Sequence, residues 1–80
     1  MGRLANISGR EAVKAFSKIG YRLERQEGSH MILYNSMPGR PILSIPDHRE
    51  IAPGLLRAQI NRVGLSVEEF LSLVKAKKKG

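Results

Sequence analysis

The sequence predicts an α+β domain in which helices pack on a small three-stranded antiparallel sheet. Apolar residues recur at helical spacing near both ends of the chain, and three short extended segments lie between them. These segments are separated by turns that contain glycine or proline, and strands joined by such short turns pair antiparallel. Since amphipathic helices must cover one face of so small a sheet, we expect the opposite face to be open to a partner.

The length and the composition limit the kind of protein. Eighty residues suffice for one domain, spanning 1–80, in which 75–80 is expected to be a frayed basic tail. The absence of cysteine excludes a disulfide framework, thiol catalysis and a cysteine zinc site, and two histidines without carboxylate help are too few for a metal centre. We therefore expect no metal or other cofactor. No apolar run approaches the ~20 residues of a membrane span, and no signal peptide is recognised, so we expect a cytoplasmic protein without membrane contact.

The net charge is +7, from 14 Lys and Arg against 7 Asp and Glu. A field this positive favours nucleic acid, an anionic surface or an acidic partner, although excess basic residues also serve solubility. The arginines are spread along the chain, and guanidinium groups pair with phosphate in a bidentate way that lysine does not match. The charge pattern therefore favours a nucleic-acid partner.

The first helix is predicted from its two ends. Ser8 and Glu11 form a capping box, Ile7 and Ala12 a hydrophobic staple, and Gly20 stops the helix. Its apolar face consists of Ala12, Val13, Phe16 and Ile19.

Three strands are predicted at 21–26, 30–35 and 41–46. The first turn, 27–29, belongs to the three-residue class of hairpin loop that favours a glycine, and 36–39 is a Pro-Gly turn. The second strand is apolar at both parities, so alternation does not tell which face His30 shares. The prolines that flank the third strand mark strand ends or a sheet edge.

The last part of the chain predicts two helices after a polar connection at 47–52. Pro53 suits the first position of a helix, and Gly64 closes it. A second capping box, Ser66 with Glu69, starts the last helix. The apolar stripes of these helices are Leu56, Ile60 and Val63, and then Val67, Phe70, Leu71 and Val74.

The element order, with a Gly-x-His turn at 28–30 between the first two strands, resembles the double-stranded-RNA-binding domain. That family places a lysine cluster at the start of the helix after the sheet, where this chain has Pro53-Gly54-Leu55-Leu56. The missing lysines argue against a plain duplex-binding module.

The chain is more similar to the HicA (YcfA-like) family of mRNA interferase toxins, which uses the same fold. The resemblance is carried by the order and spacing of four segments: 20–26, 28–30, 45–57 and 64–71. It implies a metal-independent endoribonuclease that cleaves mRNA, with the histidine of the Gly-Ser-His turn, His30, as the catalytic residue. It also implies a type II toxin–antitoxin pair, in which a HicB-type antitoxin covers the toxin.

His30 also suits this chemistry on general grounds. RNA carries its own nucleophile, the 2′-hydroxyl, so cleavage needs a base, an acid and positive charge near the phosphate. Histidine exchanges protons near neutral pH, although a lone turn histidine is more often a surface residue or a cap. His48 is the candidate for a second acid/base role; its alternatives are to cap the connection or to contact the antitoxin.

The candidate RNA-binding residues are Ser29, Arg25, Arg40, Arg49 and Arg57, which lie near the hairpin or the loop after the sheet. Each arginine has the alternative of being a solvated surface charge. Two other functions compete with cleavage: a non-catalytic RNA-binding module, and an interaction protein whose basic surface meets only an acidic partner. Binding without cleavage distinguishes the first, and a lack of RNA binding the second.

Overall fold

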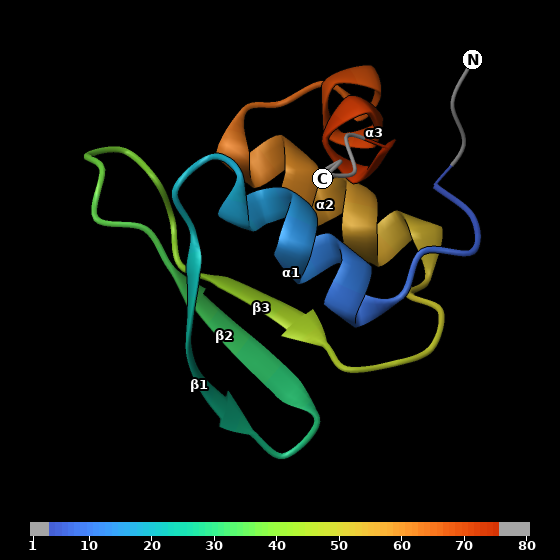
Figure 1. Ribbon diagram of the computed structural model, residues 1–80, viewed down its shortest axis with the longest axis horizontal. Helices are drawn as coiled ribbons and strands as arrows, with labels where there is room; N and C mark the ends of the chain where they lie inside the picture. The colour runs from blue at the N-terminus through green and yellow to red at the C-terminus, as the bar shows by residue number, and fades with distance from the viewer. Residues whose placement is uncertain (1–3, 76–80) are drawn as a thin grey trace, which may run out of the picture.

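The computed structural model describes residues 4–75, which form three helices and a single three-stranded sheet (Figure 1). The elements in chain order are α1 (Gly9–Ser17), β1 (Arg22–Glu27), β2 (His30–Tyr34), β3 (Leu43–Pro46), α2 (Pro53–Val63) and α3 (Val67–Lys75). The predicted α+β class and element order are confirmed.

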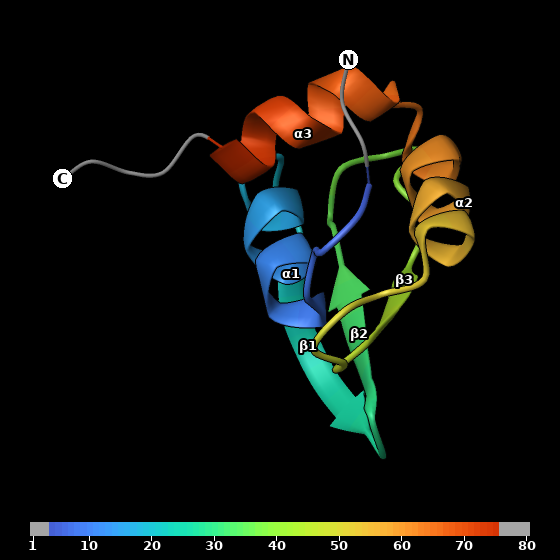
Figure 2. The ribbon, with the colours of Figure 1, turned by 90° about the vertical axis from the view of Figure 1, so that its right-hand side faces the viewer.

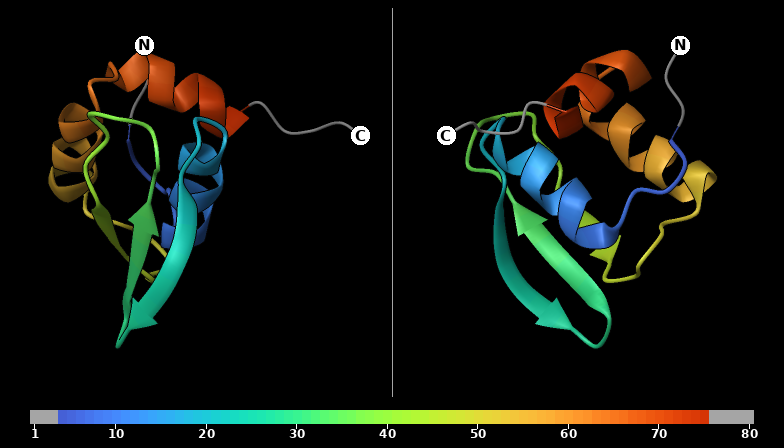
Figure 3. Two further views of the ribbon diagram at one scale, coloured as in Figure 1. Left: turned by 90° about the vertical axis from the view of Figure 1, so that its left-hand side faces the viewer. Right: turned by 45° about the vertical axis from the view of Figure 1, so that its right-hand side comes forward.

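The helices lie on one side of the sheet (Figures 1 and 2). α3 packs across α1 and α2, which in turn pack on the strands. Within residues 4–75, no helix or strand covers the other face, which Figure 3 (left) shows from the side of the strands. The tip of the β1–β2 hairpin extends beyond the helices (Figure 1). The predicted open face is therefore present.

β2 is the central strand, with β1 and β3 antiparallel on its two sides. Met31 and Leu33 are buried beneath the helices, whereas His30 at the start of the same strand is exposed. Because side chains alternate along a strand, His30 belongs to the open face. β3 is an edge strand that ends in Pro46, as the flanking prolines predict.

The first hairpin differs from the prediction. The loop has two residues, Gly28 and Ser29, and not three, because Glu27 remains in β1 as the direct partner of His30. Gly28 has φ 62°, and a glycine with positive φ at the first loop position is the pattern of a type II′ turn. Such a turn follows the twist of the flanking strands, which is why it replaces the longer loop.

The strand bounds shift in three places. The first strand is 22–27 and not 21–26, the second ends at Tyr34 and not at 35, and the third is 43–46 and not 41–46. Tyr21 instead turns inward to the core, where its hydroxyl donates a 2.7 Å hydrogen bond to the carbonyl of Pro41. Pro41 itself lies before β3, which starts at Leu43.

Both predicted capping boxes are present. The Ser8 hydroxyl accepts from the Glu11 N–H at 3.0 Å and the Glu11 carboxylate accepts from the Ser8 N–H at 2.9 Å; Ser66 and Glu69 repeat the pattern at 3.0 and 2.8 Å. At the other end, α1 stops three residues before Gly20, since i to i+3 bonds tighten the chain over 18–20.

Other boundary predictions have mixed outcomes. Pro53 is the first residue of α2, and Gly64, with φ 92°, caps its end as predicted. Lys75, assigned to the frayed tail, is the last residue of α3, and the remaining tail residues, 76–80, lie outside the described residues.

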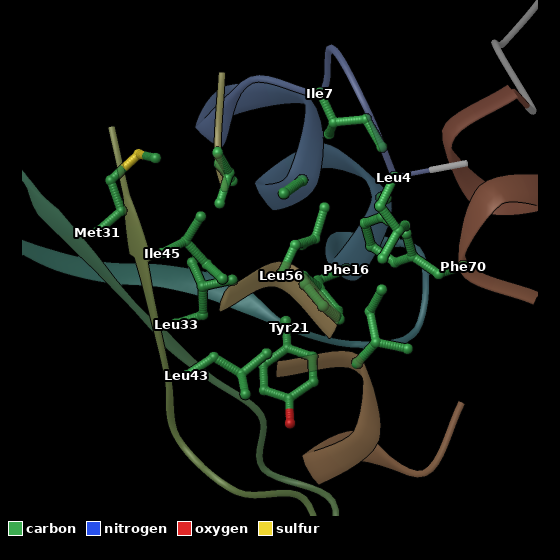
Figure 4. Packing of buried hydrophobic residues seen from close by; sticks show 14 residues of the cluster. Leu4, Ile7, Phe16, Tyr21, Met31, Leu33, Leu43, Ile45, Leu56 and Phe70 are labelled. Carbon is green, nitrogen blue, oxygen red and sulfur yellow. The ribbon is translucent and has the colours of Figure 1, made fainter. Parts of the chain in front are cut away.

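The core lies between the sheet and the three helices (Figure 4). The Phe16 ring contacts Phe70 and Tyr21, with ring centroids 5.0 and 5.8 Å apart. Ile51 corrects the prediction of a wholly polar connection at 47–52: its side chain is fully buried, and its N–H donates to the Ile7 carbonyl at 2.8 Å. The connection is thereby attached to the segment that leads into α1.

Candidate active site

His30 is the first residue of the central strand and lies on the open face of the sheet, at the hairpin end. Its direct cross-strand partners are Glu27 on β1 and Pro46 on β3. The imidazole Nδ1 is 3.4 Å from the Ser44 hydroxyl oxygen on β3. The other ring nitrogen, Nε2, is in no hydrogen bond to residues 4–75, so it is available to a substrate.

The backbone around His30 is held from two directions. The next residue, Met31, is buried among the core side chains and anchors the strand on the side that the helices cover. The Asp47 N–H donates to the Ser29 carbonyl at 2.6 Å, which ties the hairpin turn to the end of β3. A side chain on such a braced strand end keeps its direction, as acid–base chemistry requires.

Arg25 lies beside His30 on the open face, since its direct partner is the outward Ile32. Its Nε is 2.6 Å from a Glu27 carboxylate oxygen. The hydrogen bond and charge of Glu27 raise the pKa of Arg25. Because both side chains of the pair are more than half exposed, this ion pair is weak in water, and a phosphate can compete for the guanidinium.

A second ion pair braces the hairpin end from α1. Arg10 donates to both carboxylate oxygens of Asp47, at 3.1 and 3.2 Å, and Gln26 on β1 approaches Asp47 Oδ2 at 3.4 Å. The hydrogen bond from Arg10 lowers the pKa of Asp47, with further contributions from Gln26 and the nearby His48. Sequence reasoning missed Arg10, because it appears as an ordinary residue on the outer face of a helix.

The structure separates the remaining candidate residues. Ser29 is in the hairpin turn next to His30, and Arg49 is exposed just beyond the end of β3, at the same end of the sheet. Arg40 lies in the loop between β2 and β3, at the opposite end, where its charge acts on the Tyr21 hydroxyl. Arg57 is on α2, on the covered side of the sheet (Figure 2). Of these candidates, Ser29 and Arg25 therefore lie next to His30, and Arg49 lies three residues beyond Pro46, the partner of His30 on β3.

His48 is exposed on the connection after β3. Its backbone carbonyl accepts from the N–H of Gly9 at 2.9 Å, which links the connection to the start of α1. The imidazoles of His30 and His48 are not joined by a hydrogen bond in the described chain. The backbone contact is the role that the structure shows for this residue.

Arg22 and Tyr34 are direct cross-strand partners at the other end of the open face. The guanidinium carbon of Arg22 is 5.5 Å from the centroid of the Tyr34 ring, within cation–π distance. The sequence analysis assigned no role to either residue. The signal that was available is the spacing of Tyr34 from His30, which by alternation puts both on one face of a strand.

Two further features concern the described residues as a set. Over residues 4–75, no three His, Asp or Glu side chains are grouped so that they could hold a metal ion. The same stretch has no helix whose length and apolarity would let it cross a membrane.

Fold and site together define a small basic α+β domain that presents one imidazole and several guanidinium groups on an uncovered sheet. Residues 9–65 match the family model described as the HicA toxin of bacterial toxin–antitoxin systems. This match spans well over half of the chain and runs from α1 to the end of α2. The chain therefore belongs to the HicA toxin family, as the resemblance predicted. No curated protein and no solved structure matched the chain.

Proposed function

We propose that this protein is the toxin of a type II toxin–antitoxin pair and that it cleaves mRNA as an endoribonuclease, with His30 as the general base. The observation that carries the proposal is the position of His30 in a member of this family: an exposed imidazole on a braced strand, beside Arg25. Such an enzyme would act where mRNA is, in the cytoplasm.

The imidazole takes the proton of the attacking 2′-hydroxyl. In the tautomer in which Nδ1–H donates to Ser44, the lone pair of Nε2 is free to accept that proton. The 2′-oxygen then forms a bond to phosphorus, and the bond from phosphorus to the 5′-oxygen breaks, which leaves a 2′,3′-cyclic phosphate. Because the nucleophile belongs to the substrate, this route needs no metal ion.

The leaving 5′-oxygen needs a proton, and the phosphate needs positive charge. His48 is the candidate acid, and water is the alternative proton donor. Ser29 and Arg25, which lie next to His30, would hold the scissile phosphate, and Arg49, just beyond β3, would contact a neighbouring phosphate. Arg40 and Arg57 lie elsewhere, so they would contact only more distant parts of a bound RNA.

Purified protein and its His30→Gln variant, incubated with a labelled single-stranded RNA, test the proposal. Glutamine keeps a polar side chain but cannot exchange a proton at neutral pH, so turnover should fall at least ~10²-fold while RNA binding and the melting curve stay unchanged. The wild-type rate should rise from acidic to neutral pH and be unaffected by a chelator. Cleavage by His30→Gln at the wild-type rate would refute the mechanism and leave a binding module.

The role of His48 needs its own variant. If its imidazole donates the proton to the leaving oxygen, His48→Ala should lower kcat ~10²-fold or more. If water is the donor, His48→Ala should cleave at close to the wild-type rate. Because His48 contacts Gly9 only through its backbone, the variant should keep its fold in either case.

The partner of such a toxin would be a HicB-type antitoxin that covers His30 or the basic surface next to it. The hairpin end extends beyond the helices and is accessible to a protein (Figure 1). In a co-purified complex, RNA cleavage should be abolished and His30 protected from diethyl pyrocarbonate. A stoichiometric complex that cleaves at the full rate would contradict this arrangement.

A further inference from the structure

Tyr34 is an aromatic side chain on the open face of the central strand that the cleavage chemistry does not use. His30, Ile32 and Tyr34 alternate with the buried Met31 and Leu33, so all three lie on that face. Tyr34 remains 39% exposed. A strand rises about 3.3 Å per residue, which puts Tyr34 about 13 Å along the sheet from His30.

Arg22 gives this ring a positively charged neighbour. Its guanidinium lies over the ring, 5.5 Å from the centroid, and its side chain is largely exposed. The nearest carboxylate oxygen, on Glu24, is 3.8 Å away, which is a weak contact for an exposed pair. The guanidinium is therefore held near the ring but is open to a further ligand.

Two apolar residues, Ile32 and Ile42, lie near Tyr34 in or next to the sheet. Ile32 lies between Tyr34 and His30 on β2, and Ile42, just before β3, is an exposed large hydrophobic residue. An exposed aromatic ring beside a guanidinium, with apolar residues on or next to the same strands, is the combination on which unpaired nucleobases stack. An acidic protein segment would satisfy the guanidinium, but it would leave the ring face without a matching group.

We propose that Tyr34 and Arg22 form a stacking subsite for an unpaired nucleobase of the RNA that is cleaved at His30. This inference rests on the proposed function and deepens it. Stacked nucleotides are spaced by about 3.4 Å, so the base in the subsite is at most about four nucleotides from the scissile phosphate, and fewer where the strand is extended. Since every base has a π face, the subsite selects unpaired RNA and not a particular base.

The test measures binding, so that it does not depend on cleavage. His30→Ala protein is titrated with a short fluorescent single-stranded RNA and with copies in which one nucleotide at a time is abasic. For protein with Tyr34, one abasic position should weaken binding by about 5- to 150-fold, the range for loss of one base–aromatic stack. Tyr34→Leu, added to the same background, should weaken binding of the intact RNA by a similar factor and lose little more at that abasic position.

Two control variants and one further test variant complete the experiment. Tyr34→Phe keeps the ring and should bind as Tyr34 does. Leu55→Ala truncates a side chain of similar exposure on α2, 42% against 39%, and should not change RNA affinity. Arg22→Gln should reduce the slope of log K against log salt by about 0.7, one phosphate contact on a single strand, whereas Tyr34→Leu should leave that slope unchanged.

The outcomes separate this inference from the proposed function. Cleavage by wild-type protein with unchanged RNA affinity of Tyr34→Leu would overturn the subsite and leave the nuclease. Wild-type protein that shows the abasic pattern but does not cleave would overturn the nuclease and leave the subsite. If Tyr34→Leu weakens only the antitoxin complex, or if the chain binds no RNA, the subsite is overturned.

Discussion

His30 owes its accessibility to the residues on either side of it. The Gly28–Ser29 turn brings it to the hairpin end, and Met31 points into the core and so directs His30 to the open face. Ser44 then provides the one hydrogen-bond contact to its ring among residues 4–75. Gly28 and Met31 thus set the position and direction of the imidazole, and Ser44 contacts one of its ring nitrogens.

At the residue scale, the ion pair between Arg10 and Asp47 predicts a dependence of stability on acid. The pKa of the Asp47 carboxyl is lowered from 3.8 in the folded protein. The carboxylate therefore stabilises the fold fully above the unfolded-state pKa of 3.8, and this contribution is lost as the pH falls through the lower pKa of the folded state. The Tm difference between wild type and Asp47→Asn should therefore shrink below about pH 4. Thermal melts from pH 2.5 to 7 measure this Tm difference, and Glu68→Gln on α3 is the control. A Tm difference that stays constant over this pH range would contradict the prediction.

At the element scale, α1 approaches the end of β3 too closely for any side chain at its first residue. A Cβ added to Gly9 would lie 2.0 Å from the carbonyl oxygen of Pro46, which is backbone and cannot yield easily. Gly9→Ala should therefore cost about 1–3 kcal/mol or more. It should also lower turnover, because Pro46 is the direct partner of His30.

Gly54 in α2 provides the matched control for Gly9. A Cβ at Gly54 meets no atom within 4 Å, so Gly54→Ala should be neutral or stabilise the protein by up to about 1 kcal/mol, through better helix propensity. Urea unfolding of both variants tests the pair. Equal stabilities would show that the contact between α1 and β3 is looser than the structure shows.

The packing of α1 is tested by its aromatic residue. Phe16 is fully buried and lies between the rings of Tyr21 and Phe70 (Figure 4). Phe16→Ala should cost about 3–5 kcal/mol, which approaches the whole stability of a small domain. Far-UV circular dichroism at 37 °C should show a largely unfolded variant, whereas exposed Leu55→Ala should melt as wild type does; a cooperative Phe16→Ala melt near the wild-type Tm would contradict this packing.

At the scale of the whole molecule, the charge of +7 is distributed unevenly with respect to the proposed site. Arg25, Arg49 and Arg22 lie on the open face or at the hairpin end, whereas Arg57 is on the covered side. Single-stranded RNA that follows the open face would therefore use only part of the basic side chains.

The salt dependence of RNA binding measures how many basic side chains contact phosphates of the RNA. Three to five phosphate contacts predict a slope of log K against log salt of about −2 to −3.5 on a single strand. Arg25→Gln should make the slope shallower by about 0.7, and Arg57→Gln should leave it unchanged. A flat salt response of the wild-type protein would exclude phosphate binding and favour a protein partner alone.

The sequence by itself determined the elements and their order. Capping boxes at Ser8 and Ser66, Pro53 at the start of α2 and Gly64 at its end are local signals, because the atoms that satisfy each helix terminus lie within a few residues. The antiparallel sheet with an edge strand at Pro46 follows from short turns and from proline chemistry in the same way. His30 as a candidate also came from sequence, through the Gly-Ser-His turn.

Only the tertiary structure decided what surrounds His30. Its strand is apolar at both parities, so its face depends on pairing with β1 and β3 and on which residues the helices cover. The contact between Arg10 and Asp47 joins residues 37 positions apart, and no local pattern encodes it. Likewise, the strand direction carries Arg40 to the far end of the sheet, and helix packing puts Arg57 on the covered side, since spatial proximity depends on chain packing and not on closeness in sequence.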